Sequence, residues 1–583
     1  MKKVLSLITI FALLMTITLT GVYAQTTGIS KITEPDYYKL DSDLSNEIKA
    51  AGGVVKGKEF RNANTNSYLL PNEGYPIQPI DARTAAGQPA KGIAILVDFP
   101  ANEDETSAVP GVDYEQVPAN YFYDLLNGTE YNPYDLSVFS WLAEYNGVPA
   151  PTDRTLKNYF NEVSYGQFEI DVDLAGWYTL SQPYDYYLGQ DGFAIGNENG
   201  DARIAELVSD AIDLADEDID FSNYAVDGKV PNIFIIHRGT GAEYNLDPTI
   251  IWSHKWDIVS ATYYGYYYQT GEYMDEADLE YKVVDGVIVN VYNIVPEVGQ
   301  DISGYLKYVY PGLFPADYDG REPSPAYPGV YSHEFAHILG LPDQYDYGYQ
   351  SEGTGMYTLM AGGSYGRNIN YRWYSGNTPV HLNAWDKWYL GFAEPIVVSS
   401  NQSITLNPVE YSKDIYKLVV PGSNGREYFL LENRQQIGYD TGLSYNVDGE
   451  SLHGLVVYHI VDDMIQKKFN RPNEAQNWDI NHLGKGQQSS SSYGQTHYGM
   501  SVIQADGNYD LEHGYNDADA GDVFPGKYNV TRLGSISNNV TGIANTSSLY
   551  KWDSKSTDTG INLENIVEDE NGVITLDVVF QKK

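Results

Sequence analysis

Residues 332–343 of this chain read Ser-His-Glu-Phe-Ala-His-Ile-Leu-Gly-Leu-Pro-Asp. Side chains four positions apart lie on one face of an α-helix, so His333 and His337 are expected to direct their imidazole rings at the same point. The glycine and the proline that follow are typical of a helix end and a chain reversal. Asp343 can therefore return a carboxylate to that point, and Glu334 lies beside the first ring.

Two imidazoles and one carboxylate that leave a position open for water are typical of a catalytic zinc site rather than a structural one. The sequence therefore predicts His333, His337 and Asp343 as zinc ligands, with Glu334 able to reach a water held by the ion. The alternative interpretation is an ordinary helix with a solvated pair of histidines. A chance match to His-Glu-x-x-His alone is common, but the glycine and the aspartate at their spacings make it far rarer.

The composition is that of a globular, strongly acidic protein. Its 36 Lys+Arg against 79 Asp+Glu give a formal net charge of −43, which disfavours nucleic acid and anionic membrane surfaces as partners. The same charge favours solubility and bound cations such as Ca²⁺. Because Cys is 0, disulfides are excluded, and bound ions are the expected substitute for them. The oligomeric state stays open, with a monomer preferred.

The N-terminus has the pattern of a secretory signal peptide. Lys2 and Lys3 precede a mostly apolar run, which ends in a small-residue cleavage pattern, Val-Tyr-Ala. Residues 1–24 are therefore predicted to be removed and the protein to be secreted, without stable membrane insertion; the alternative is a membrane anchor. Residues 25–88 are polar and turn-rich, and we interpret them either as the pro-segment of a zymogen or as an N-terminal arm.

Residues 89–395 alternate between short apolar runs and helical patterns, which predicts an α+β catalytic domain. Strands are expected at 92–99 and 232–237, helices at 153–164, 201–215 and 381–390, and an edge strand able to pair with an extended peptide at 250–254.

Four smaller features of this region carry expectations. His237 and His254 are interpreted as hydrogen-bonded within the fold rather than as metal ligands. The tyrosine-rich run at 263–268 is interpreted as sheet packing in preference to a substrate-facing surface, because tyrosine is a strand former. Asp-Gly at 285–286, between β-branched runs, predicts a hairpin. Met360, in a tight apolar turn, is expected beneath the metal site, the alternative being an ordinary core methionine.

After Pro395 the sequence becomes rich in short strands, which predicts a β-rich, sandwich-like C-terminal domain over residues 396–583. This region also contains a dense group of acidic residues around turns. The group is a candidate structural Ca²⁺ site, and the alternative is a solvated acidic loop. Its members are Asp506, Asp510, Asp517, Asp519 and Asp522.

The stretch from His333 to Asp346, together with Met360, resembles the zinc motif and the Met-turn of the immune inhibitor A-like secreted metallopeptidases of the metzincin clan. The likeness extends over residues 90–580. It is carried further by Ser164-Tyr165-Gly166, Ile251-Trp252-Ser253-His254 and the stretches 427–434, 455–459, 505–507 and 520–526.

This resemblance implies a metzincin-like catalytic domain, with a twisted mixed sheet and an active-site helix, ahead of the β-rich domain. It implies that His333, His337 and Asp343 bind zinc and that Glu334 is the catalytic base. It also implies an extracellular protein, made with a signal and a pro-segment and often stabilised by calcium. Asp346 stays open as an alternative third ligand because it lies close by.

The predicted function is that of a secreted zinc-dependent endopeptidase, a hydrolase that cleaves extracellular protein or peptide substrates bound along an edge strand. Tyr365 could assist the oxyanion, although nothing in the sequence selects it from the other tyrosines. One alternative is a catalytically inactive secreted or cell-surface binding protein with a relic metal site, and another is a structural metal module. The intact ligands and Glu334 argue against both.

Overall fold

The computed structural model describes most of the chain from residue 89 onward. The described residues are 61–62, 67–68, 89–101, 109, 111–129, 131–133, 136–139, 153–188, 203–231, 233–245, 249–275, 278–299, 323–346, 351–368, 375–444, 450–462, 465, 472–473, 499–536, 544–552 and 556–581. The predicted signal peptide lies outside them, as does the predicted pro-segment or arm apart from a two-stranded antiparallel pair, β1 (Arg61–Asn62) and β2 (Ser67–Tyr68).

A five-stranded mixed sheet forms the centre of the region before residue 396. Its order is β4 (Ile170–Thr179), β3 (Ala90–Asp98), β6 (Ile233–Thr240), β10 (Val291–Val298) and β7 (His254–Asp257). The first four strands are parallel, whereas β7 runs antiparallel to β10 at one edge. The mixed sheet and the edge strand were expected, but the edge strand begins at His254, four residues later than predicted.

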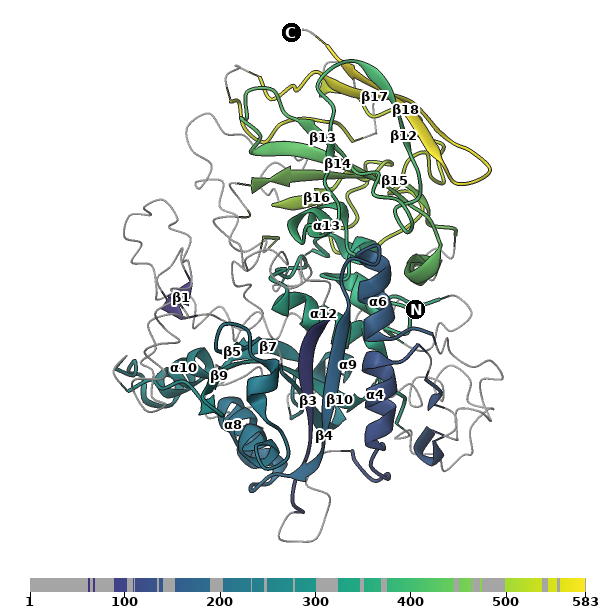
Figure 1. Ribbon diagram of the computed structural model, residues 1–583. Coiled ribbons are helices and arrows are strands. Elements are labelled where there is room, and N and C mark those ends of the chain that lie inside the picture. Colours follow the sequence, from purple (N-terminus) through teal and green to yellow (C-terminus); the bar gives the residue numbers. More distant parts are fainter. Residues whose placement is uncertain are drawn as a thin grey trace.

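Helices cover both faces of this sheet (Figure 1). One face carries α4 (Ala119–Asn127), α6 (Leu156–Val163) and α12 (Pro328–Ile338), and the other carries α8 (Ile204–Ala215). Alternate residues of β3 point to opposite faces: Ala94 and Leu96 join the core around α12, whereas Ile93 and Ile95 join the core around α8. Burial on both sides explains why this strand is continuously apolar.

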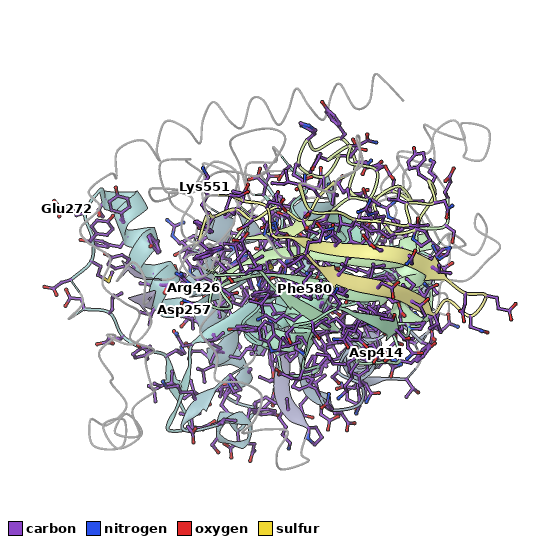
Figure 2. All side chains as sticks on the ribbon, turned by 90° about the horizontal axis from the view of Figure 1, so that it is seen from above. Asp257, Glu272, Asp414, Arg426, Lys551 and Phe580 are labelled. Carbon is purple, nitrogen blue, oxygen red and sulfur yellow. The ribbon has the colours of Figure 1, made fainter. Side chains whose placement is uncertain are left out.

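The tyrosine-rich run at 263–268 is helical, so the expected sheet packing is wrong. It lies in α10 (Ile258–Thr270). The Asp257 side chain accepts a hydrogen bond from the Ser260 backbone N–H at the start of this helix, and Gly271, with φ 74°, ends it. These capping groups outweigh the preference of tyrosine for strands. In Figure 2, Glu272, just beyond the helix, lies at one edge of the molecule.

The hairpin predicted at Asp285-Gly286 is confirmed. It joins β8 (Val283–Val284) to β9 (Val287–Val289), and both turn residues have positive φ, 51° and 75°. β9 also pairs with β5 (Lys229–Val230) in a small third sheet.

Beyond residue 395 the described chain is rich in strands, as predicted. One sheet has the order β11 (Ile396–Val397), β13 (Tyr416–Val419), β14 (Glu427–Arg434), β15 (Gly454–Val461) and β16 (Met500–Val502). The other has the order β12 (Gln402–Leu406), β18 (Ile574–Phe580) and β17 (Ile561–Glu568). Side chains from both sheets share one apolar core, which is typical of a sandwich. The boundary between 395 and 396 stays a prediction.

The remaining elements are short. They are α7 (Tyr184–Leu188), α9 (Ala242–Asn245), α13 (Ala384–Tyr389), η2 (Ser137–Phe139), η4 (Phe221–Tyr224), η5 (Gly355–Tyr357), η6 (Gly362–Tyr365) and η8 (Gly438–Ser444). Among the described residues, no helix has the length and apolar character needed to cross a bilayer.

A buried arginine joins the β-rich region to the segment that follows α12. Arg434, at the end of β14, donates hydrogen bonds to Asp440 through Nε and Nη2, at 2.5 and 2.6 Å. Its Nη1 donates to the Tyr357 carbonyl at 2.7 Å and to Glu432 at 3.1 Å. All three charged side chains are fully buried. Because two carboxylates surround one guanidinium out of contact with water, the arrangement depends on every member.

We expect Arg434→Met to reduce the free energy of unfolding by about 3–5 kcal/mol, because it leaves two buried carboxylates without their cation. Urea unfolding of the purified protein measures this change. The control is Arg532→Met, since the Arg532–Glu564 ion pair is about a third exposed and is expected to contribute at most about 1 kcal/mol. Equal losses in the two variants would contradict the role given to the buried network.

Candidate metal centre

Helix α12 carries the two histidines through the interior of the molecule. Pro328 occupies its first turn, where a missing N–H costs nothing, and every residue of the helix is buried. The helix ends where predicted: Gly340 has φ 99°, and its N–H donates to the His337 carbonyl at 3.0 Å. The Leu341 N–H then reaches back to the Ala336 carbonyl at 3.2 Å, so the chain reverses directly after the second histidine.

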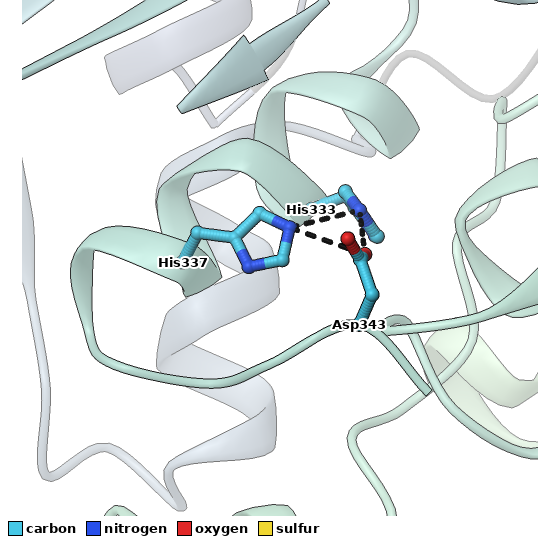
Figure 3. Close-up of side chains that lie close together, drawn as sticks. All are labelled: His333, His337 and Asp343. Carbon is cyan, nitrogen blue, oxygen red and sulfur yellow. Dashed lines mark hydrogen bonds and ion pairs between the residues drawn. The ribbon is translucent and has the colours of Figure 1, made fainter. Parts of the chain in front are cut away.

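The reversal brings three side chains together (Figure 3). The Nε2 atoms of His333 and His337 lie 3.0 and 3.2 Å from Asp343 Oδ1, and 3.2 Å from each other. Asp343 and His337 are fully buried. Among the described residues, this is the group in which three His, Asp or Glu side chains place one ligand atom each within 4.8 Å of the others.

The backbone determines which ring nitrogens face this point. His333 Nδ1 lies 2.9 Å from the Leu359 carbonyl, and His337 Nδ1 lies 2.7 Å from the Leu341 carbonyl. A carbonyl oxygen only accepts, so each Nδ1 carries the hydrogen and each neutral ring presents a lone pair at Nε2. Two lone pairs and one carboxylate oxygen then converge, and only a cation satisfies all three.

The spacing of the three atoms fits zinc. Bonds of about 2.0–2.2 Å in a tetrahedron place ligand atoms about 3.3–3.5 Å apart. The observed separations of 3.0–3.2 Å are slightly shorter, and the nitrogen and oxygen donors are types that zinc prefers. His333, His337 and Asp343 are therefore the residues that would hold the ion.

The electrostatics of the group also favour a cation. Burial opposes a charge on His333, but the hydrogen bond to Asp343 and the Asp343 charge outweigh it and raise the pKa of His333 to about 9. Burial works against ionised Asp343 as well, yet the two histidines hold its pKa well below the usual range. Without a metal the group would therefore retain a proton, and metal binding would release it.

Glu334 lies directly beside this group and is nearly inaccessible to water. Burial raises its pKa to about 8; His333 lowers the pKa, and the charges of Asp343 and Glu243 raise it. The Lys255 backbone N–H, in edge strand β7, donates to its carboxylate. Glu334 Oε2 is buried and has no hydrogen-bond partner among the described residues. A carboxylate with an unused oxygen and a raised pKa is suited to accepting and delivering a proton.

The turn that contains Met360 borders the group. The Leu359 carbonyl accepts from His333, and the Met360 carbonyl accepts from the Gln344 N–H at 2.8 Å. Met360 itself is fully buried in the same core as Phe335 of α12. The turn therefore orients a ligand ring and secures the chain just after Asp343.

This turn is also held by a second set of contacts, which the sequence did not reveal. The Gln344 side chain donates to Asp386 Oδ1, and Thr358 Oγ1 donates to Asp386 Oδ2, both at 2.5 Å. Asp386 belongs to the capping box of α13, with Asn383 as its partner. No sequence pattern links these positions, because the two contacts join residues 42 and 28 positions apart in the chain.

His237 and His254 have the hydrogen-bonded arrangement that was expected. Their Nδ1 atoms lie 2.9 and 2.7 Å from the carbonyls of Arg238 and Trp252. Burial lowers the pKa of each to about 4, so both rings are neutral. The Tyr365 ring packs against Tyr244, at 6.5 Å between centroids, and its role at an oxyanion stays a prediction.

The acidic group in the β-rich region is only partly assembled. A side chain at Gly521 would meet both Asp506 and Asp519, so these two carboxylates face the same point. Asp522 is buried and accepts from the Tyr357 hydroxyl, and its Oδ1 has no hydrogen-bond partner among the described residues. The charge of Asp517 raises the pKa of Glu352.

Two histidines from a buried helix and an aspartate from the turn after it form a group that could hold a metal ion, and such a donor set is typical of metal-dependent hydrolases. A family model described as "Immune inhibitor A peptidase M6, catalytic domain" matches residues 81–319 and 302–393, which is more than half of the chain. The chain therefore belongs to the immune inhibitor A (M6) family of metallopeptidases. This confirms the resemblance seen in the sequence.

Two curated relatives are similar to this chain. Pre-pro-metalloprotease PrtV of Vibrio cholerae is 23% identical over 362 residues, which are 58% of this chain and 33% of PrtV. Immune inhibitor A of Bacillus thuringiensis subsp. alesti is 28% identical over 257 residues, which are 40% of this chain and 31% of that protein. The matches thus span about a third of the length of these relatives.

The choice between Asp343 and Asp346 as third ligand is open to a direct measurement. We expect Asp343→Ala to lose most of its zinc, because it removes the one carboxylate oxygen close to both rings. Asp346→Ala should keep close to one zinc per chain. Metal analysis after dialysis compares them, and undiminished zinc in Asp343→Ala rejects Asp343 as a ligand.

Proposed function

We propose that this protein is a secreted zinc-dependent endopeptidase that cleaves extracellular proteins, with Glu334 as its general base. The observation that carries the proposal is the convergence of His333, His337 and Asp343 beside a buried carboxylate with an unused oxygen. Membership of a metallopeptidase family supports peptide hydrolysis as the reaction class.

In the proposed reaction, the metal, Glu334 and the surrounding backbone have separate roles. A bound zinc ion supplies Lewis acidity, which makes water nucleophilic near neutral pH and polarises the carbonyl of the scissile peptide bond. Glu334 accepts the proton of the attacking water and afterwards delivers it to the leaving amine. Its buried position keeps its basicity high, and the Lys255 N–H orients its carboxylate. The Leu359 and Leu341 carbonyls hold the two ligand rings in place.

Edge strand β7 gives a place for the substrate. It pairs with β10 on one side, and among the described residues no strand pairs with its other side. An extended peptide can add to such an edge through hydrogen bonds to the outward carbonyls of β7, since the outward Lys255 N–H already donates to Glu334. Because Lys255 of this strand contacts Glu334, a peptide bound here would pass the metal centre.

We also propose that the catalytic region is metzincin-like. The support comes from four features: the mixed sheet with an antiparallel edge strand, the active-site helix, the glycine turn that leads to the third ligand, and the buried Met360 in a turn bordering a ligand ring. The signal-like N-terminus supports secretion, and the name of the relative PrtV, a pre-pro-metalloprotease, supports a pro-segment within residues 25–88. Intact Glu334 argues against the relic binding protein.

Glu334→Ala is expected to bind zinc normally and to cleave casein at least about 100-fold more slowly than the wild type, because it removes the general base but no ligand. Zinc content and casein hydrolysis are measured on the same preparation. A surface variant, Glu169→Ala, serves as the control, and the wild-type activity should disappear with a chelator and return with zinc. Casein cleavage at the wild-type rate by Glu334→Ala would reject the assigned base.

We further propose that the acidic group binds a structural Ca²⁺ ion, supported by the facing carboxylates of Asp506 and Asp519 and the buried Asp522 oxygen without a hydrogen-bond partner among the described residues. Calcium titration calorimetry should show binding heat in the wild type and none in Asp519→Ala or Asp522→Ala, each of which removes an oxygen ligand. Identical heats in all three proteins would remove the idea.

A further inference from the structure

A second carboxylate lies beside the metal centre and has no part in holding the metal. Glu243 is in the short helix α9, directly after β6. Its Oε1 accepts from Ser253 Oγ at 2.7 Å, and its Oε2 accepts from the Ser253 N–H at 3.1 Å. Burial raises its pKa, and His333 lowers it. Ser253 directly precedes edge strand β7, and β7 packs against α12, the helix that carries Glu334.

The position of Glu243 is constrained by its surroundings. A side chain at Gly241 would lie 2.2 Å from Glu243 Oε1, so the carboxylate occupies space that only a glycine leaves open. On the other side, both oxygens are held by Ser253. The next residue, Tyr244, packs against Tyr365, the last residue of η6. Glu243 is therefore fixed between the edge strand and the segment that follows the Met360 turn.

The Glu243 and Glu334 carboxylates lie on the same side of the extended chain at Ser253–Lys255, the side proposed to face the substrate. The Ser253 N–H donates to Glu243, and the Lys255 N–H donates to Glu334. N–H groups two residues apart in an extended chain point in the same direction. A peptide bound with its scissile bond at Glu334 would therefore bring a neighbouring side chain towards Glu243, which occupies the edge beside Ser253.

The described residues provide no cationic hydrogen-bond partner for Glu243. The groups that hold its oxygens are neutral, and among the described residues no lysine or arginine forms an ion pair with it. The side chain is nevertheless half-buried rather than sealed from solvent. A held carboxylate that stays accessible is suited to a charge-assisted hydrogen bond with an incoming cation.

We propose that Glu243 determines specificity by binding the cationic side chain of a substrate lysine or arginine next to the scissile bond. The inference rests on the proposed peptidase function and names its preferred substrate class. It gives Glu243 a contact with substrate but no part in proton transfer or metal binding.

The test compares matched peptides that differ only in one side chain next to the scissile bond, lysine against norleucine and arginine against citrulline. The wild type should prefer the charged member of each pair by about 10- to 100-fold in kcat/KM, the range of a hydrogen bond to a charged group. Glu243→Gln keeps a side-chain oxygen for Ser253 but loses the charge, so its preference should fall to near one. Glu243→Asp should restore part of the preference.

Glu512→Gln is the matched control, because Glu512 is also a half-buried glutamate of raised pKa held by a neutral side chain, Gln504. It should retain the wild-type preference. If Glu243 served only to hold the Ser253 segment, Glu243→Gln would slow all peptides equally and leave the ratios unchanged, which would overturn the proposal.

Binding in the inactive Glu334→Ala background separates this inference from the proposed function. Fluorescence anisotropy should show tighter binding of the lysine peptide than of the norleucine peptide, and the difference should vanish when Glu243→Gln is added. Selective binding without cleavage by the wild type would reject the peptidase function and keep the cation site. Cleavage by the wild type without any charge preference would reject the cation site alone.

Discussion

Two backbone carbonyls determine which nitrogen of each histidine faces the candidate metal site. The carbonyls of Leu359 and Leu341 each accept a hydrogen bond from the Nδ1 of a histidine, which leaves both Nε2 lone pairs directed at Asp343. Three acceptor atoms within about 3 Å of one another repel unless a positive charge lies among them. The fold thus creates a demand for a cation before any ligand is present, and a proton or a metal ion must meet it.

The three acceptor atoms stay this close together only if the backbone that holds them is rigid. The Leu359 carbonyl belongs to a turn that is held by Gln344 and Thr358, whose side chains both reach Asp386. The turn begins near Tyr357, whose carbonyl accepts from the buried Arg434 of the β-rich region. A chain of buried polar contacts therefore runs from the β-rich region to the His333 ring. The β-rich region thus helps to fix the position of a candidate metal ligand.

The sequence was a reliable guide wherever the determining contacts are local. The four-residue spacing of His333 and His337 and the glycine after them predicted both the ring positions and the chain reversal, because helix periodicity and positive φ act over a few residues. The β-rich region was predictable from its strand patterns and the hairpin from its Asp-Gly turn, whereas the mixed sheet was expected from the family resemblance. The tyrosine run was misjudged because Asp257 and Gly271, at its ends, decided its structure. The roles of Glu243, Asp386 and Arg434 could not be found. No sequence pattern pairs Glu243 with Ser253, and Asp386 and Arg434 also contact Gln344 and Tyr357, which are 42 and 77 residues away in the chain.

The charges of the residues around the candidate metal centre are not balanced by a divalent cation alone. Asp343, Glu334 and Glu243 carry three negative charges when ionised, and the two neutral histidines add none. A divalent cation balances two of them, so one negative charge is left in a site with little water to screen it. The protein outside the site has a formal net charge of the same sign, since the whole chain carries −43. Under the proposed function, the proton that Glu334 gains during hydrolysis and a cationic group on the substrate are two components able to balance this charge. Under the proposed mechanism, a positively charged substrate side chain at Glu243 would offset the negative charge beside Glu334, so that Glu334 could take up a proton and release it again in each turnover.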